Sequence, residues 1–383
     1  MVNSQSSLLT FAGCIVNSSQ RAEQLTQLYE LVTNYSLSKH LEKQLNVDHN
    51  SFKWFEKFKL LDSKTWKTAP EKIPYIAATT LIDSYSCLPK RPDMAFTYLW
   101  TAVNSCYNDL FLKTNTTSAK LTDTGSISNS INIISTHLQT KIPNTQSAAS
   151  QTIDKTIVDF AKRIPDKTLH FVATYLLKGI AIESHNKTCS SNSAQKIRDI
   201  HISSTYSSFK KRFGAIHNYV EWMFGQKYSA ICSISEASGK TDVDFGISTK
   251  DKIKSRDIIH ALGKELQKII IERPNLSQYN DKGIKTSDAQ SIGTEAQRLE
   301  LLVFGILYAS RNNNAHGNVA SRINSIYANA ESIKSATWVY LFSYFYLSLL
   351  LYCLNSILID DLEIHTSNLT LLRVTSKTQP HKS

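Results

Sequence analysis

The spacing of apolar residues predicts helices along most of the chain. Apolar positions recur every three or four residues, which places them on one face of a helix. The clearest stripe follows Asp93, a residue suited to cap a helix over 93–112, and consists of Phe96, Leu99, Trp100, Val103, Tyr107 and Leu110. Similar stripes occur at 169–182, 258–271 and 294–310, where Thr294 and Gln297 match a capping box. We therefore predict a mainly α fold built as a helical bundle.

The most apolar stretch of the chain is 335–359, which contains no charged side chain. Its length would allow it to span a membrane. However, tyrosines at 340, 344, 346 and 352, with serines and an asparagine, are spread through its middle. We prefer a buried last helix of the bundle, partly at a dimer interface, and expect no membrane contact.

Composition suggests three regions. Residues 1–90 predict an N-terminal helical extension, 91–360 the helical bundle with insertions, and 361–383 a C-terminal tail. Within the bundle, residues 114–152 are dense in Ser, Thr, Asn and Gln. Such a composition buries little apolar surface, so we expect most of this stretch to be an inserted, mobile polar loop.

One β-hairpin is predicted in this helical chain, because residues 228–235 and 243–248 alternate in the manner of strands around the turn at 236–241. The second strand carries Asp242 and Asp244. Paired aspartates on a strand bind divalent metal ions in nucleotidyltransferases, where a Gly-Ser turn upstream holds the nucleotide phosphates. The nearest equivalent here, Cys232-Ser233, lacks the glycine, so surface carboxylates are the favoured interpretation.

The charge of the chain indicates a polyanionic partner. The formal net charge is +11 among 383 residues. Residues 162–273 contain 19 Lys and Arg against 11 Asp and Glu, so most of the surplus lies in this middle region. The densest part is Lys210-Lys211-Arg212, beside aromatic residues on a predicted helix. We expect nucleic acid ahead of a membrane surface, with these three residues as candidates for phosphate contacts; a solvated helix face is the alternative.

The cysteines place the protein in a reducing compartment. Six cysteines show no C-x-x-C pair and no regular spacing, which argues against a disulfide framework and a structural zinc site. The apolar N-terminal stretch at 8–16 follows no Lys or Arg, so we predict no signal peptide. We expect a cytoplasmic protein that needs neither a metal ion nor a cofactor.

Candidate chemistry concentrates at 302–317, where an apolar helix leads to Arg311, three asparagines, His316 and Gly317. We expect the asparagines to break the helix, which would let Arg311 and His316 converge beyond its end. A guanidinium binds phosphate oxygens in pairs, and an imidazole transfers protons near neutral pH. With RNA, the substrate's own 2′-hydroxyl can serve as nucleophile, and Asn312 could orient the phosphate. The structural alternative is that Arg311 and His316 only tie down a helix end.

Residues 311–317 resemble the R-N-x-x-A-H-G form of the Arg-x4-6-His motif in HEPN domains, including the Apea-like branch. A second stretch, residues 96–107, is similar to the F-x-x-L-W-x-A-x-N-x-x-Y first helix of such domains. The resemblance implies a helical bundle with large insertions. Many HEPN domains are metal-independent ribonucleases of toxin–antitoxin and antiphage systems, while others have lost catalysis and only bind. His316 is followed by Gly317-Asn318, without the tyrosine that marks antitoxin modification in one branch.

Our first hypothesis is therefore a metal-independent endoribonuclease, a toxin or antiphage effector, with Arg311, His316 and Asn312 as catalytic residues. One His provides only one proton-transfer role, so a homodimer would supply the second. RNA is the expected substrate, and an antitoxin or regulatory protein is a possible partner. The second hypothesis is a non-catalytic HEPN module that binds RNA or a partner, and the third is a nucleotidyltransferase that uses Asp242 and Asp244.

Overall fold

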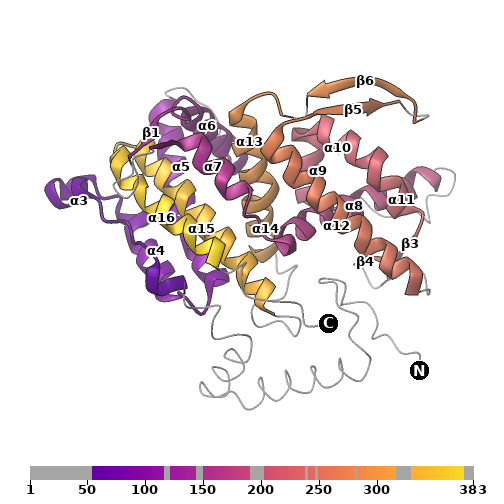
Figure 1. Ribbon diagram of the computed structural model, residues 1–383, viewed down its shortest axis with the longest axis horizontal. Coiled ribbons are helices and arrows are strands. Elements are labelled where there is room, and N and C mark those ends of the chain that lie inside the picture. Colours follow the sequence, from indigo (N-terminus) through magenta and orange to yellow (C-terminus); the bar gives the residue numbers. More distant parts are fainter. Residues whose placement is uncertain are drawn as a thin grey trace, which may run out of the picture. The chain divides into compact units, whose positions relative to one another are not determined.

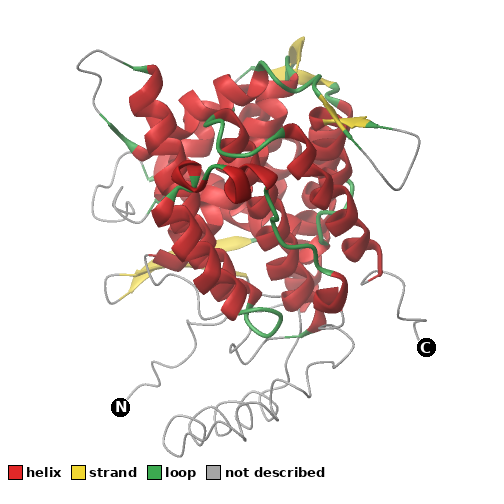
Figure 2. Cartoon of the chain, turned by 90° about the vertical axis from the view of Figure 1, so that its left-hand side faces the viewer, coloured by secondary structure: helices red, strands yellow, loops and turns green. Residues whose placement is uncertain are grey.

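The structure is a computed structural model that describes residues 54–115, 121–143, 150–189, 202–237, 240–245, 249–280, 283–290, 292–315 and 329–374. Helices dominate these residues, and the strands form only two-stranded antiparallel sheets (Figure 2). The predicted mainly α class is confirmed at this level. The described residues divide into two compact units, which are treated separately below.

The α15 unit comprises the described residues of 54–165, 294–303 and 310–374. Its elements are α3 (Lys64–Thr68), η2 (Pro70–Lys72), α4 (Tyr75–Ser86), α5 (Pro92–Thr114), α6 (Asp123–Ser135), β1 (Lys141–Ile142), β2 (Gln151–Thr152), α7 (Ile153–Ala161), α13 (Glu295–Leu302), α14 (Ala309–Ala315), α15 (Ala330–Cys353), η7 (Ile359–Leu362) and α16 (Glu363–Val374).

The α8 unit comprises the described residues of 166–293 and 304–309. Its elements are α8 (Asp166–Thr188), α9 (Ser204–Arg212), α10 (Gly214–Val220), the π-helical turn η5 (Glu221–Gly225), α11 (Gln226–Ser229), β3 (Cys232–Ala237), β4 (Lys240–Phe245), α12 (Thr249–Glu272), β5 (Asn275–Tyr279), β6 (Lys285–Gln290) and the π-helical turn η6 (Val303–Tyr308).

Helix α15 is the core helix of its unit, and it packs along α5 and against α16 (Figure 1). It is long and apolar enough to cross a membrane, but 89% of its most apolar window is buried inside the fold. Two of the tyrosine hydroxyls in its middle find protein partners: the hydroxyl of Tyr344 lies 2.6 Å from that of Tyr85, and the hydroxyl of Tyr346 lies 2.7 Å from that of Ser130. These contacts are typical of a core helix, because buried hydroxyls need hydrogen bonds. The predicted buried helix is confirmed.

The expectation of a loop over 114–152 is wrong for residues 123–135, which form α6. Thr122 caps this helix, accepting a hydrogen bond from the backbone N–H of Gly125 at 3.2 Å. Ile127, Ile131 and Ile134 are buried on one face, at the i, i+4 and i+7 spacing of a helix. Small serines separate them and lower the average hydrophobicity, which is why the composition suggested a loop although the periodicity was present.

The expected boundaries at residues 90 and 361 do not separate packing regions. On the N-terminal side, α4 packs along α5, and the hydroxyl of Ser84 donates to the carbonyl of Ala95 at 2.9 Å. At the C-terminal end, the expected tail contains α16, so α15 is not the last helix. The side chain of Asn368 on α16 accepts from the N–H of Lys59 at 2.8 Å and donates to its carbonyl at 3.0 Å. Both ends of the described chain thus belong to the α15 unit.

The α8 unit contains the predicted hairpin and a second one. Strand β3 begins at Cys232 and not at residue 228, because Tyr228 lies buried in α11. Strands β5 and β6, which pair with Leu276 opposite Ala289, occupy a stretch for which the sequence analysis predicted no strand. The alternation there is weak, since the side chains of β6 are polar throughout except Ala289.

Candidate functional site

The candidate motif ends a helical run made of α13, η6 and α14. The predicted capping box begins it: Gln297 N–H donates to the Thr294 hydroxyl at 3.2 Å, and Thr294 N–H donates to the Gln297 side chain at 3.1 Å. The backbone stays helical through Ala315, so the expectation that the asparagines break the helix at once is wrong. The irregularity lies earlier, in the π-turn η6. Such turns insert an extra residue into a helix and often occur near functional sites.

Arg311 lies on α14 with its guanidinium partly exposed and held at two points. Its Nη1 donates to the side-chain oxygen of Asn312 at 3.1 Å, and its Nη2 lies 3.5 Å from a carboxylate oxygen of Asp123 on α6. Asn312 is buried, with 8% of its surface exposed. The neighbouring asparagine therefore orients the guanidinium, a contact that the sequence analysis did not predict. His316, the other half of the predicted pair, lies outside the described residues.

Asp123 is a site residue that sequence reasoning missed, since it falls in the stretch assigned to a polar loop. The side chains of Arg311 and Asp123 are 30% and 37% exposed. An ion pair this open contributes at most about 1 kcal/mol, because water screens both charges. The sequence of α6 does contain a helix pattern: a capping threonine is followed by an acidic residue and by a stripe of isoleucines. That pattern would have placed Asp123 in the first turn of a helix.

The predicted phosphate contacts Lys210, Lys211 and Arg212 end helix α9 in the α8 unit, but the structure gives them different surroundings. The ammonium of Lys210 lies 2.7 and 2.8 Å from the carboxylate oxygens of Glu183. The guanidinium carbon of Arg212 lies 3.7 Å from the centroid of the Phe304 ring, a cation–π contact. Lys211 is exposed. Lys210 and Arg212 therefore each contact a protein side chain, and the phosphate contacts stay a prediction.

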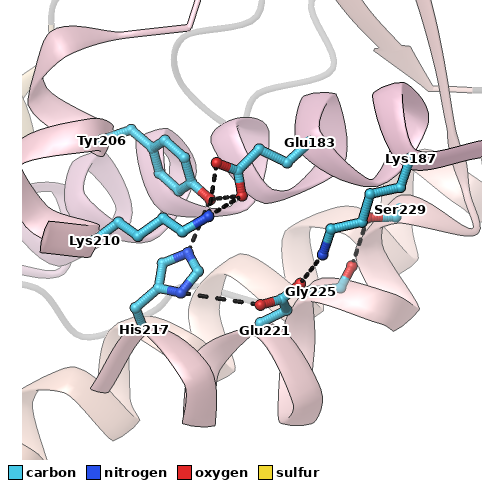
Figure 3. A network of polar contacts seen from close by, with 8 residues as sticks. All are labelled: Glu183, Lys187, Tyr206, Lys210, His217, Glu221, Gly225 and Ser229. Carbon is cyan, nitrogen blue, oxygen red and sulfur yellow. Dashed lines mark hydrogen bonds and ion pairs between the residues drawn. The ribbon is translucent and has the colours of Figure 1, made fainter. Parts of the chain in front are cut away.

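Lys210 belongs to a polar network in which Tyr206 and His217 are buried (Figure 3). The Tyr206 hydroxyl donates to Glu183 at 2.7 Å, so its oxygen accepts from Nε2 of His217 at 2.8 Å. Burial opposes the charge of Glu183, but hydrogen bonds from Lys210 and Tyr206 outweigh it and lower the pKa of this carboxyl. Burial and the nearby charge of Lys210 lower the pKa of His217. The imidazole is therefore neutral at pH 7.

Close helix packing builds this network. A Cβ atom at Gly179 on α8 would lie 2.3 Å from the ring of Tyr206, so only glycine allows the tyrosine to reach Glu183. At the other end, His217 Nδ1 lies 4.0 Å from Glu221 Oε2, and Lys187 pairs with the same residue at 3.2 Å. Because Tyr206 and His217 are almost fully buried, the network joins α8, α9 and α10.

The structure describes no metal site for the alternative hypothesis of a nucleotidyltransferase. Asp242 and Asp244 pair in register with Ser235 and Ser233 of β3, but their side chains lie outside the described ones. Among the residues that the structure describes, no group of three or more His, Cys, Asp or Glu side chains is arranged to hold a metal ion.

Comparison of the chain with protein-family models, with curated proteins and with solved structures finds no match.

Proposed function

We propose that this protein is a metal-independent endoribonuclease of the HEPN type that acts in the cytoplasm. Arg311 clamps the scissile phosphate, His316 transfers a proton, and Asn312 orients the guanidinium. The 2′-hydroxyl of the substrate attacks the adjacent phosphorus, the bond to the 5′-oxygen breaks, and the products are a 2′,3′-cyclic phosphate and a 5′-hydroxyl. The observation that carries the proposal is the partly exposed Arg311, held by its buried neighbour Asn312 at 3.1 Å.

The contact with Asp123 is compatible with phosphate binding. The Arg311–Asp123 separation of 3.5 Å between two partly exposed groups makes a weak ion pair. The two non-bridging oxygens of a phosphodiester can each accept a hydrogen bond from the Arg311 guanidinium, which is the bidentate geometry that guanidinium favours. RNA can therefore displace Asp123 at little energetic cost, and a guanidinium fixed before binding loses little entropy when the substrate arrives.

Two proton transfers are needed, one from the 2′-hydroxyl and one to the leaving oxygen. The motif supplies one histidine per chain, so we propose a homodimer in which two copies of His316 face one phosphate. The net charge of +11 favours association with RNA. An antitoxin or regulatory protein remains part of this proposal, because a cytoplasmic nuclease must be restrained in the cell that makes it.

Cleavage of total RNA by the full-length protein in EDTA tests the proposal. We expect cleavage that persists in the chelator, leaves cyclic phosphate ends, and stops when the nucleotide on the 5′ side of the scissile phosphate is 2′-deoxy. His316→Ala and Arg311→Ala should each reduce the rate by about a hundredfold or more, and Asn312→Ala by less. Asn313→Ala is the matched control, since it changes the same triplet outside the proposed roles. Cleavage by His316→Ala at the wild-type rate would contradict the mechanism.

A second candidate is a non-catalytic HEPN module that binds RNA or a protein partner. The observation that favours it is the Arg311–Asp123 contact itself, which would serve as a structural link between α14 and α6 if the protein had no catalytic role. In that case no cleavage is seen under any condition. RNA affinity then survives Arg311→Ala but falls when exposed lysines of the α8 unit, such as Lys211, are removed.

A further inference from the structure

Two histidines meet across helices α8 and α12 in the α8 unit. His170 Nε2 lies 3.1 Å from His260 Nδ1, and the two rings stand at 74° to each other. Gly263, one turn along α12, allows this approach, because a Cβ atom there would already lie 3.2 Å from the Cβ of Leu169. The close packing of the two backbones thus brings these side chains together.

A second contact one turn away holds the same register. Lys264, four residues after His260, pairs with Asp166, four residues before His170, at 2.7 Å. With Gly263 and this ion pair on the same side, the two imidazoles keep their separation without support from a ligand. His260 is exposed and His170 is half-buried, so an ion in solution can reach both rings.

The separation of the two nitrogens suits one metal ion. Zn²⁺ and related divalent transition metals bind imidazole nitrogen at about 2.0–2.1 Å, so two such ligands lie about 2.9 Å apart at a right angle and about 3.4 Å apart at the tetrahedral angle. The observed 3.1 Å falls between these limits. Both Nδ1 and Nε2 are common metal ligands. We propose that His170 and His260 form a binding site for a divalent transition-metal ion such as Zn²⁺.

The site is open, since no cluster of three ligating side chains occurs among the described residues, and water completes the coordination. Without metal, the N–H of one ring hydrogen-bonds the lone pair of the other. Binding requires that this ring carry its proton on its other nitrogen and that the rings turn until both lone pairs point at the ion, and neutral imidazoles are the form that binds metal.

The bound ion would act as a link between α8 and α12. Because an unfolded chain does not hold these two rings at a fixed distance, the ion binds the folded state better and stabilises it. This role is separate from the proposed RNA cleavage, which needs no metal. The two proposals can therefore fail independently: stabilisation by zinc without RNA cleavage, or cleavage without stabilisation.

The test is a Zn²⁺ titration of the full-length protein, first freed of metal with a chelator, followed by calorimetry and by thermal unfolding. We expect Zn²⁺ to raise the unfolding temperature of the wild type. His170→Gln and His260→Gln should each weaken binding at least tenfold and abolish the temperature shift. His185→Gln is the matched control, because His185 on α8 lies 3.6 Å from Cys189 and forms with it another described pair of zinc-type ligands in this unit. His137→Gln, in the α15 unit, controls for weak binding to any surface histidine.

The proposal is overturned if Zn²⁺ binds wild type and His260→Gln equally, or if the two control variants lose as much affinity as the test variants, which would indicate adventitious binding. If His170→Gln folds poorly, the Zn²⁺ affinity of His260→Gln still tests the proposal, since the exposed His260 can be replaced without disturbing the core. Circular dichroism of each metal-free variant confirms that the fold is retained.

Discussion

Two arginine–aspartate pairs in the α15 unit differ in how deeply their side chains are buried. Arg298 of α13 pairs with Asp154 of α7 at 2.6 Å, and their side chains are only 5% and 16% exposed. Arg311 of α14 pairs with Asp123 at 3.5 Å, and these side chains are 30% and 37% exposed. The charges are the same, but only the second pair is open to water and to a ligand. The first pair joins α13 to α7 inside the fold, whereas the second is partly exposed.

Breaking the buried pair should have the largest effect on stability. Arg298→Met keeps much of the side-chain volume but leaves Asp154 without its guanidinium, so we expect a loss of about 3–5 kcal/mol in the free energy of unfolding. Urea denaturation measures it. The matched change in the exposed pair, Arg311→Met, should cost less than about 1 kcal/mol. Equal losses in the two variants would show that burial does not distinguish these pairs.

Burial also determines how the stability of the protein depends on pH, as a buried histidine illustrates. His365 of α16 is fully buried, with Nε2 2.8 Å from the Ser348 hydroxyl, and burial lowers its pKa to about 3. At a pH between that value and the unfolded pKa of about 6.5, His365 is protonated in the unfolded chain but not in the native protein. Stability should therefore fall by about 1.4 kcal/mol per pH unit as the pH drops below about 6.

This slope is measured by urea denaturation between pH 4 and pH 7. His365→Asn lacks the titrating ring, so its unfolding free energy should lose less across that range, although it is less stable at pH 7. His260→Gln serves as the exposed control and should leave the slope nearly unchanged. A wild-type slope that persists in His365→Asn would assign the pH dependence to other groups, such as the buried His217.

The smallest expected effect concerns the exposed pair itself. Asp123→Asn removes a negative charge that competes with phosphate for Arg311, so we expect RNA affinity to rise a few-fold while stability changes by less than about 1 kcal/mol. Fluorescence anisotropy with a labelled RNA at fixed salt measures the affinity. Asp109→Asn, an exposed change on α5, controls for the general gain in positive charge. Weaker RNA binding by Asp123→Asn would mean that Asp123 is needed to orient the guanidinium.

Much of the helical framework was predictable because its signals are local. The stripe of 93–112, the Thr294 capping box and the uncharged stretch at 335–359 each involve residues within a few turns of one another. The structure forms helices at all three, although α15 ends at Cys353 and not at residue 359. The prediction failed where polar residues dilute a helical stripe, as in α6, or where a short hairpin carries little alternation, as in β5 and β6.

The sequence by itself determined the helical class, the principal core helices and the placement of Arg311 beside Asn312. Only the tertiary structure decided which charges remain accessible: Lys210 is held by Glu183, Arg212 lies on Phe304, and Arg311 faces Asp123. The reason is the distance along the chain over which each interaction acts. Helix periodicity and capping depend on neighbours within about four residues, whereas the pairing of a charge depends on residues that folding brings together from distant parts of the chain.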